Sequence, residues 1–255
     1  IISGKGGVGK TTSAINLSSA LHAEGKNVLL VDSSISTPDV AIHLGAPVIP
    51  VSMHHVLAGR ARAKEAIYMH SSGLRILPGS ISLQDMKRAR PELMKKAIDS
   101  LKKSADFLIV DSTAGFGKET LHAIESASEV IIVTNPELPS VTNALKAVKI
   151  AEGMGKAITG VIVTRVGGKH EMPLNEIEEM LETRILGVVP EDSKIKEAAA
   201  SKDILVCSHP RSKAAREYRK IAARLIGKEH KERGARGEKR EGFFSWLLKK
   251  TRLKK

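Results

Sequence analysis

Short apolar runs alternate along the chain with segments in which apolar residues recur at helical spacing. The apolar runs, such as "NVLLV" and "VIIVT", have the length and the β-branched content of buried strands. In the segment 11–24, Ala14, Leu17 and Leu21 fall on one helical face, and Gly25 then provides a stop signal. We expect strands at residues 27–31, 74–77, 107–110, 130–134, 159–164 and 185–189, and helices at residues 11–24, 91–103, 140–152, 174–182 and 211–226.

This alternation predicts an α/β fold with a mostly parallel sheet and helices on both of its faces. The chain has 255 residues, of which 42% are hydrophobic, so it is long enough to bury the core of one sizeable domain of this type. Ligands of such sheets bind beyond the carboxyl ends of the strands. Candidate binding residues are therefore expected in the turns that follow the strands.

The first turn, "SGKGGVGKTT" at residues 3–12, fits the phosphate-binding pattern G-x-x-x-x-G-K-[ST]. In a P-loop of this kind the backbone N–H groups cradle phosphate, the lysine contacts the β and γ oxygens, and the hydroxyl ligates Mg²⁺. A glycine-rich turn without a ligand is the alternative interpretation. The residues expected to bind ATP here are Gly4, Lys5, Gly6, Gly7, Val8, Gly9, Lys10, Thr11 and Thr12.

Asp111 is the candidate acidic partner of the metal, together with Thr11. It ends the apolar run "FLIVD", which is the usual place for the aspartate that holds Mg²⁺ through water in P-loop proteins. The alternative is an ordinary strand-end aspartate that caps a turn.

Five blocks together resemble the MinD/ParA class of deviant Walker ATPases: "KGGVGKTT", "VLLVD", "VDSTAGFGKET", "VTNPELPSVTNALK" and "LGVVPED". The "DSTAG" and "TNPE" blocks and the C-terminal tail are most similar to MinD, especially to its archaeal forms. The resemblance covers residues 1–227 and implies a single P-loop ATPase domain. It also implies positioning of the division site or of polar structures, and recruitment of an activator or cargo protein.

Lys5 is the additional lysine of this loop. The resemblance implies that it reaches across an ATP-bound homodimer to the phosphates of the partner chain, while Lys10 serves the nucleotide of its own chain. There Lys5 would offset developing charge, as an arginine finger does. A solvated loop lysine is the alternative.

One departure from the resemblance concerns hydrolysis. Relatives read D-x-D after the "VLLVD" strand, whereas "VDSSISTPD" places Ser34 at the second aspartate. A serine hydroxyl can hold water but cannot supply the anionic acceptor of a carboxylate. The resemblance places Asp32 in the outer shell of the metal, and Asp39 substitutes for the missing carboxylate only if the loop folds back. We therefore expect a slow ATPase.

Weaker candidates follow the later strands. The resemblance implies that Thr164, Arg165, Pro190 and Glu191 hold the adenine base, whereas Asp192 or Ser193 is expected to be a helix N-cap. The histidines show no metal-ligand spacing and are expected at the surface. They include His54, His55, His170 and His209.

The net charge of +13 is concentrated near the C-terminus, where residues 228–255 hold eleven Lys and Arg against four Asp and Glu. Residues 228–242 are charged and nearly devoid of apolar side chains, which predicts a flexible linker. Residues 243–255, "FFSWLLKKTRLKK", combine an apolar wedge with basic residues, as amphipathic membrane-targeting helices do. A helix docked on its own domain, or a disordered end, is the alternative. The wedge consists of Phe243, Phe244, Trp246, Leu247 and Leu248.

Three functions remain in competition: a membrane-cycling ATPase, a ParA-type DNA-partitioning ATPase, and an ATP-binding scaffold with little hydrolysis. DNA binding would not need the apolar wedge, so we expect an anionic membrane surface instead. Cys207 alone cannot hold a cysteine-ligated cluster within one chain, which argues against an iron–sulfur carrier. No secretory signal or run of roughly 20 apolar residues is present, so we expect a cytoplasmic protein that is peripheral on the membrane.

Overall fold

The computed structural model of the protein describes residues 1–46 and 49–228. The predicted membrane-targeting segment 243–255 and nearly all of the predicted linker 228–242 lie outside the described residues. Both therefore stay predictions, as does the domain boundary between them.

The strands are almost all parallel and belong to two hydrogen-bonded groups. One group has the order β2-β3-β1-β4 and the other β5-β6-β7, with the short strand β2 as an antiparallel edge. The strands are β1 (Val28–Asp32), β2 (Tyr68–Met69), β3 (Arg75–Leu77), β4 (Phe107–Asp111), β5 (Glu129–Thr134), β6 (Ala157–Val166) and β7 (Ile185–Pro190).

The first two residues join these groups into one sheet. On one side the amino group of Ile1 donates to the carbonyl of Val110 at 2.6 Å. On the other side the N–H of Ile2 donates to the carbonyl of Ile131 at 3.0 Å, and the N–H of Val133 donates to the carbonyl of Ile2 at 2.9 Å. The chain therefore enters the glycine-rich loop from the middle of the sheet, where ligands of open α/β sheets bind.

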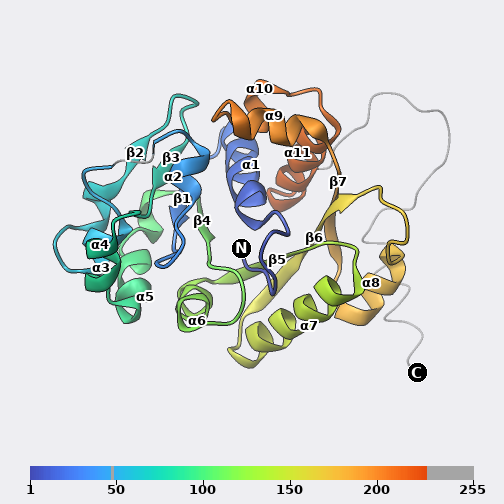
Figure 1. Ribbon diagram of the computed structural model, residues 1–255, viewed down its shortest axis with the longest axis horizontal. Coiled ribbons are helices and arrows are strands. Elements are labelled where there is room, and N and C mark those ends of the chain that lie inside the picture. The colour runs from blue at the N-terminus through green and yellow to red at the C-terminus, as the bar shows by residue number, and fades with distance from the viewer. Residues whose placement is uncertain (47–48, 229–255) are drawn as a thin grey trace.

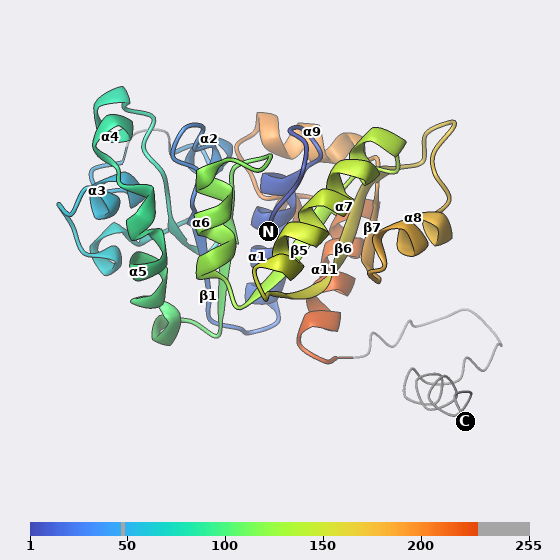
Figure 2. The ribbon, with the colours of Figure 1, turned by 90° about the horizontal axis from the view of Figure 1, so that it is seen from below.

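Helices cover both faces of the sheet, with α1 and α11 on one face and α6 and α7 on the other (Figures 1 and 2). The α-helices are α1 (Lys10–Ala23), α2 (Val40–His43), α3 (Met53–Leu57), α4 (Leu83–Arg88), α5 (Met94–Asp99), α6 (Lys118–Ser126), α7 (Leu138–Gly153), α8 (Leu174–Leu181), α9 (Ser193–Ala200), α10 (Leu205–Ser208) and α11 (Lys213–Leu225). Three short 3₁₀ turns are η1 (Ala63–Ala66), η2 (Pro91–Leu93) and η3 (Lys102–Ser104).

The helix α1 is buried over most of its length because α11 covers the side that faces away from the sheet. Buried polar groups between the two helices satisfy each other: the hydroxyls of Ser13 and Tyr218 lie 3.1 Å apart. Close packing continues at Gly187, where an added Cβ would lie 2.3 Å from the side chain of Ile221. These contacts fix the N-terminus of α1, which carries the P-loop, against the sheet.

The predicted α/β class is confirmed, and the six predicted strands and five predicted helical segments all overlap elements of the structure. The strand β2 and the helices α2, α3, α4, α6 and α10 were not predicted, and of α9 only the N-cap was predicted. The segment 91–103 is not one helix, because it tightens into 3₁₀ turns on both sides of α5. The expectation that His54 lies at the surface is wrong, since its side chain is fully buried. Within the described residues, no helix combines the length and the apolar content that crossing a membrane requires.

Candidate functional site

The loop between the first residues and α1 requires glycine at several positions. Gly7 and Gly9 have φ angles of 77° and 85°, in the left-handed region that side chains disfavour. An added Cβ on Gly4 would lie 2.3 Å from the carbonyl oxygen of Asn143 in α7. The loop therefore turns tightly against α7 and leads directly into the N-terminus of α1, where backbone N–H groups favour an anion.

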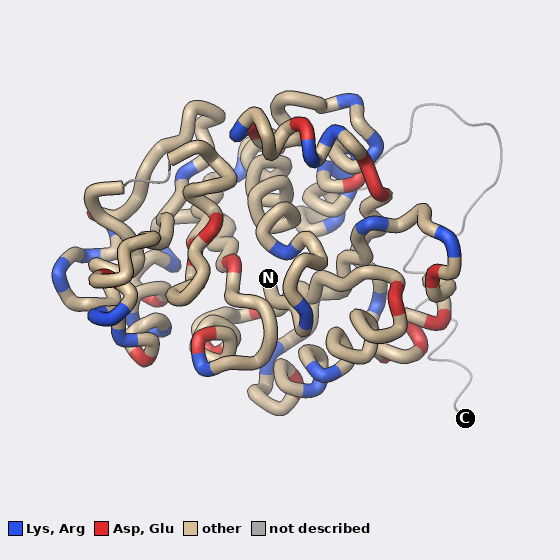
Figure 3. Tube along the Cα trace, viewed as in Figure 1, with Lys and Arg blue, Asp and Glu red and all other residues tan. Residues whose placement is uncertain are grey.

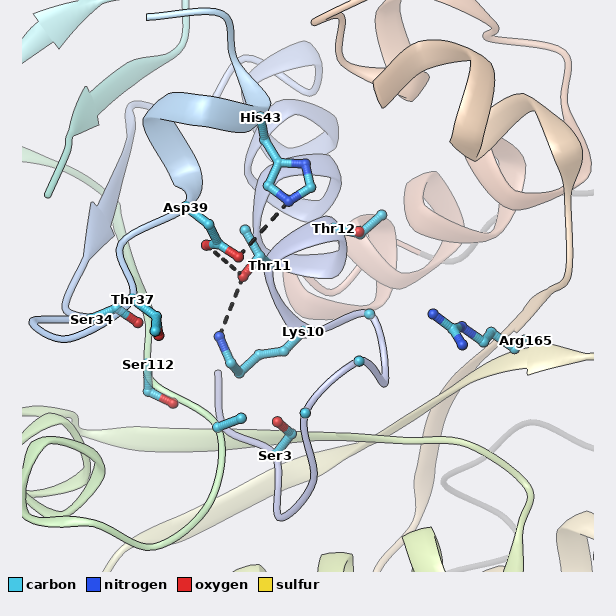
Figure 4. Close-up of a pocket in the computed structure, with 14 residues that line it drawn as sticks. Ser3, Lys10, Thr11, Thr12, Ser34, Thr37, Asp39, His43, Ser112 and Arg165 are labelled. Carbon is cyan, nitrogen blue, oxygen red and sulfur yellow. Dashed lines mark hydrogen bonds and ion pairs between the residues drawn. The ribbon is translucent and has the colours of Figure 1, made fainter. Parts of the chain in front are cut away.

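A cavity of about 310 Å³ opens over this loop (Figure 4). Its volume is at the lower end of the range of small-molecule sites. Serine, threonine, lysine and arginine side chains and glycine backbone dominate its lining, as is typical of a phosphate site. The predicted site residues that line it are Gly6, Gly7, Gly9, Lys10, Thr11, Thr12, Ser34 and Arg165.

A buried ion pair lies at the base of the cavity. The Nζ of Lys10 is 2.8 Å from Oδ1 of Asp111, and both side chains are almost inaccessible, at 9% and 0% exposed. The hydroxyl of Thr11 donates to the other carboxylate oxygen of Asp111 at 2.6 Å. The three side chains that the P-loop pattern assigns to phosphate and metal are thus in direct contact.

These donors fit Mg²⁺, which prefers oxygen ligands and retains several waters when it binds with nucleotide phosphates. The Thr11 hydroxyl and the carboxylates of Asp111 and Asp39 present such oxygens around one point. Within residues 1–46 and 49–228, no three His, Cys, Asp or Glu side chains gather to hold a metal by themselves. The set therefore suits an ion that is completed by phosphate and water.

Asp32 has a different environment from Asp111. Its carboxylate is fully buried and accepts hydrogen bonds from the backbone N–H groups of Ser34, Asp39 and Val40 at 3.0, 3.1 and 3.2 Å. Burial, together with the neighbouring negative charge of Asp111, raises the pKa of Asp32 to about 8. In this structure Asp32 shapes the loop after β1, and its predicted place in the outer shell of a metal stays a prediction.

The loop after β1 folds back over the P-loop. This is the condition under which Asp39 can substitute for the carboxylate that Ser34 lacks. Oδ1 of Asp39 accepts a hydrogen bond from the Thr11 hydroxyl at 3.1 Å, and Asp39 lines the cavity together with Ser34 (Figure 4). Burial raises the pKa of Asp39, and the charge of Asp111 acts in the same direction. A carboxylate is therefore present near the metal position although Ser34 occupies the place of the second aspartate.

Comparison with known proteins agrees with this geometry. The CobQ/CobB/MinD/ParA nucleotide binding domain matches residues 1–206. The chain belongs to this family. An uncharacterized ATP-binding protein of Methanocaldococcus jannaschii is 40% identical over 250 residues, which cover 98% of this chain and 94% of the relative.

Two solved structures show the same fold at 35% identity. The cell division ATPase MinD of Pyrococcus furiosus superposes with a TM-score of 0.86 over 89% of this chain and 97% of its own. The septum site-determining protein MinD of Pyrococcus horikoshii, complexed with Mg-ADP, superposes with a TM-score of 0.85 over 88% of this chain and 93% of its own. Family membership and this likeness imply a nucleotide and Mg²⁺ as cofactors.

Thr164 and Arg165, which were predicted to hold the adenine base, both lie near the P-loop. The buried hydroxyl of Thr164 lies 2.6 Å from the carbonyl oxygen of Val8 and so ties the P-loop to β6. Arg165 has a φ of 56°, unusual for a residue with a side chain, and lies across the loop from Ser34 and Asp39 (Figure 4).

The turn after β7 lies off the cavity. Pro190 and Glu191 do not line it, and the N–H of Glu191 donates to the carbonyl of Val166 at 2.9 Å. The side chain of Asp192 accepts from the N–H of Lys194 at 3.0 Å, which confirms Asp192 as the N-cap of α9. The adenine contacts of this turn stay a prediction.

Lys5 also lies outside the cavity of its own chain. Its ammonium group is 3.5 Å from the carboxylate of Glu137, and the two side chains are 47% and 58% exposed. Lys5 is therefore a solvent-accessible cation beside the P-loop, held weakly by an exposed ion pair.

Glu119 was not predicted from the sequence, although it organises the site. Its carboxylate accepts from the N–H groups of Ile35 and Ser36 at 3.0 and 3.3 Å, and from the hydroxyls of Ser36 and Thr113. The Thr113 hydroxyl also lies 3.3 Å from the hydroxyl of Ser34. Glu119 therefore joins the loop after β1 to the loop after β4.

The pKa of Glu119 reflects this role. Partial burial alone would raise it, but the hydrogen bonds from Ser36, Thr113 and the loop backbone outweigh burial and lower the pKa below its ordinary value of 4.5. A carboxyl group whose pKa is lowered on folding stabilises the fold above its unfolded pKa. The stabilisation is lost as the pH falls through the lower folded value.

We expect Glu119→Ala to reduce the free energy of unfolding by about 1–3 kcal/mol, since two backbone N–H groups lose a charged acceptor. Amide exchange at Ile35 and Ser36 should accelerate at least about tenfold. Denaturant unfolding and hydrogen exchange measure the two effects, and the difference from wild type should shrink on acidification below about pH 4.5. Glu125→Ala, an exposed change in the same helix, is the matched control, and equal exchange in both variants would contradict the role.

Proposed function

We propose that this protein is an ATPase that dimerises on binding ATP and cycles between the cytoplasm and an anionic membrane surface. In the membrane-bound state it would position or recruit partner proteins, at the division site or at the cell pole. The single observation that carries the proposal is the contact of Lys10, Thr11 and Asp111 at the base of the cavity, with Lys5 accessible outside it. This arrangement supports one lysine acting on the chain's own phosphates and one on those of another chain.

ATP rather than a smaller anion is supported by the extent of the cavity. It reaches from the P-loop glycines to the guanidinium of Arg165, so a phosphate chain at Lys10 leaves room for the rest of a nucleotide. The N-terminus of α1 and the buried charge of Lys10 favour the phosphates. Thr11 and Asp111 would hold Mg²⁺, which neutralises phosphate charge when it is bound.

Dimerisation is supported by the position of Lys5. The exposed ammonium group of Lys5 pairs with Glu137 and does not line the cavity of its own chain, but it can reach a second copy placed over that face. Because ATP would lie between the two chains, nucleotide binding and association would stabilise each other by mass action.

Membrane association is supported by the composition of residues 243–255. One short helix of this kind binds weakly and reversibly, whereas two helices in a dimer bind far more tightly because the second contact is intramolecular. A nucleotide that controls dimerisation would therefore control attachment. The ParA-type alternative would use the basic charge on DNA, and the scaffold alternative would follow if Asp39 failed to replace the missing aspartate.

The first test separates the two lysines. We expect Lys10→Ala to abolish nucleotide binding, because it removes the buried cation at the phosphates. Lys5→Ala should keep nucleotide affinity within about twofold but lose the ATP-dependent dimer, which sedimentation with ATP and with ADP detects. Lys146→Ala, an exposed lysine on α7, is the control for a lost surface charge. If the Lys5→Ala variant dimerises with ATP as the wild type does, Lys5 has no role across the dimer.

The second test concerns Ser34 and Asp39. If the Asp39 carboxylate orients the attacking water, single-turnover hydrolysis at saturating Mg²⁺ and ATP should fall about 10²-fold in Asp39→Asn, the low end for general-base effects. Adding Ser34→Asp should restore part of that loss. If instead Asp39→Asn is as fast as wild type and Ser34→Asp alone accelerates turnover, Ser34 limits the natural enzyme and Asp39 has no catalytic role.

The third test concerns the C-terminal segment. Replacing Trp246 and Leu247 by glutamate should abolish flotation with anionic liposomes in ATP, because the apolar burial is lost and the added charge is repelled. Nucleotide binding should not change, since the P-loop domain is untouched. Replacing Lys254 and Lys255 by alanine, which keeps the wedge, should weaken flotation only partly. Undiminished flotation of the glutamate variant would place the membrane contact elsewhere.

A further inference from the structure

The net positive charge of the described residues comes from one region. Residues 50–104, here called the basic lobe, contain eleven Lys and Arg against four Asp and Glu. The other described residues contain twenty of each and have no net charge. Figure 3 shows the basic positions gathered around α3, α4 and α5, at the end of the molecule opposite α8.

Within the part of the chain that the structure describes, most cations of the lobe have no acidic partner. Arg62 pairs with Glu65, while Lys95 and Lys102 share Asp99. No carboxylate of the described residues lies within ion-pair distance of the remaining exposed cations of the lobe. These are Arg60, Lys64, Lys87, Arg88, Arg90, Lys96 and Lys103.

Arg90, which follows α4, contacts the end of α3. The N–H of Arg90 donates to the carbonyl of Leu57, the last residue of α3, at 3.2 Å. The guanidinium of Arg90 lies against Gly59, next to Arg60. Uncompensated charge in this area attracts an anionic surface and disfavours a cationic one.

Exposed apolar side chains lie directly beside these cations. The helix α4 buries none of its residues, Leu83 at its start is 73% exposed, and Ile81 just before it is 48% exposed. Leu83 and Lys87 are four residues apart and therefore share one face of the helix. Apolar and basic groups on one exposed segment are the composition of a contact with the headgroup boundary of a membrane.

Nucleic acid fits this surface less well. Binding to duplex phosphates needs cations and derives nothing from exposed leucine and isoleucine. Single strands are held by stacking on exposed aromatic rings. The lobe contains one aromatic residue, Tyr68, which is half-buried and accepts from the N–H of Val51 at 2.9 Å.

The lobe is also attached to the nucleotide site. The fully buried ring of His54 contacts the carbonyl of Ile35 through Nε2 at 2.9 Å and accepts from the N–H of Ser80 through Nδ1 at 2.9 Å. Ile35 follows Ser34 of the cavity, and Ser80 precedes Ile81 of the exposed segment. The exposed segment therefore begins one residue after Ser80, which is linked to the loop of the site through the ring of His54.

We propose that the basic lobe is a second membrane contact, in which Lys87, Arg88 and their neighbours bind anionic headgroups while Ile81 and Leu83 enter the boundary region. The inference rests on the proposed membrane cycling but uses residues that are remote in the sequence from the segment 243–255. Each basic residue near an anionic surface contributes about fivefold in affinity.

The test is sedimentation of the full chain, with ATP, on vesicles of phosphatidylglycerol and phosphatidylcholine in equal parts. Lys87→Glu with Arg88→Glu should lower the partition coefficient at least about tenfold and reduce its salt dependence. Ile81→Ser with Leu83→Ser should lower it about threefold or more without changing the salt dependence. Arg211→Glu with Arg216→Glu, the same charge change just before and within α11, is the matched control and should alter partition less than about threefold.

Unchanged nucleotide affinity shows that each variant is folded, since none of these residues lines the cavity. The proposal is overturned if the Lys87/Arg88 variant sediments like the control, or if it keeps vesicle binding and loses binding to duplex DNA. The Trp246/Leu247 variant on the same vesicles separates this inference from the proposed function. If the Trp246/Leu247 variant loses vesicle binding and the lobe variants do not, the proposed membrane cycle is supported and the membrane contact of the basic lobe is rejected.

Discussion

The buried charge of Lys10 is the constraint on which the site depends. An ammonium group that is 9% exposed is costly unless an anion compensates it, and Asp111 supplies that anion at 2.8 Å. This requires β4 to end beside the P-loop, and the chain must enter the loop between β4 and β5. The observed sheet order thus brings one strand-end carboxylate to one buried lysine.

Carboxylates crowd this edge of the sheet as a consequence. Asp32 and Asp111 are register partners on adjacent parallel strands, and Asp39 folds back onto the Thr11 hydroxyl. Burial, and after it the repulsion between these carboxylates, raises the pKa values of Asp32 and Asp39, so this edge favours a proton or a metal cation. A divalent cation bound with nucleotide phosphates would satisfy Asp111 and leave Lys10 to the phosphates. Asp111 and Lys10 would thus each have a partner of opposite charge both with and without bound ligands.

The strands and the P-loop could be predicted from the sequence because both are local patterns. Apolar runs mark buried parallel strands, and the G-x-x-x-x-G-K-[ST] spacing fixes the glycines and Lys10 within a few residues. Glu119 and His54 could not be predicted, since their partner Ile35 lies 84 and 19 residues away in the sequence. The contact between Asp39 and Thr11 could be predicted only on the condition that the loop after β1 folds back. That folding depends on Asp32, whose carboxylate accepts from the backbone N–H groups of Asp39 and Val40.

Glu119 and His54 act on the same short segment from opposite sides. Glu119 accepts from the N–H of Ile35, while His54 contacts the carbonyl of that residue, so both polar groups of one peptide segment are engaged. Because Nδ1 of His54 accepts from Ser80, Nε2 must carry the proton, and burial lowers the pKa of the ring. A neutral, fully engaged, buried histidine cannot reorient without breaking two hydrogen bonds. Any displacement of Ile35 by a ligand in the cavity must therefore be accommodated by α3 and by the backbone before Ile81, which is where the exposed segment of the basic lobe begins.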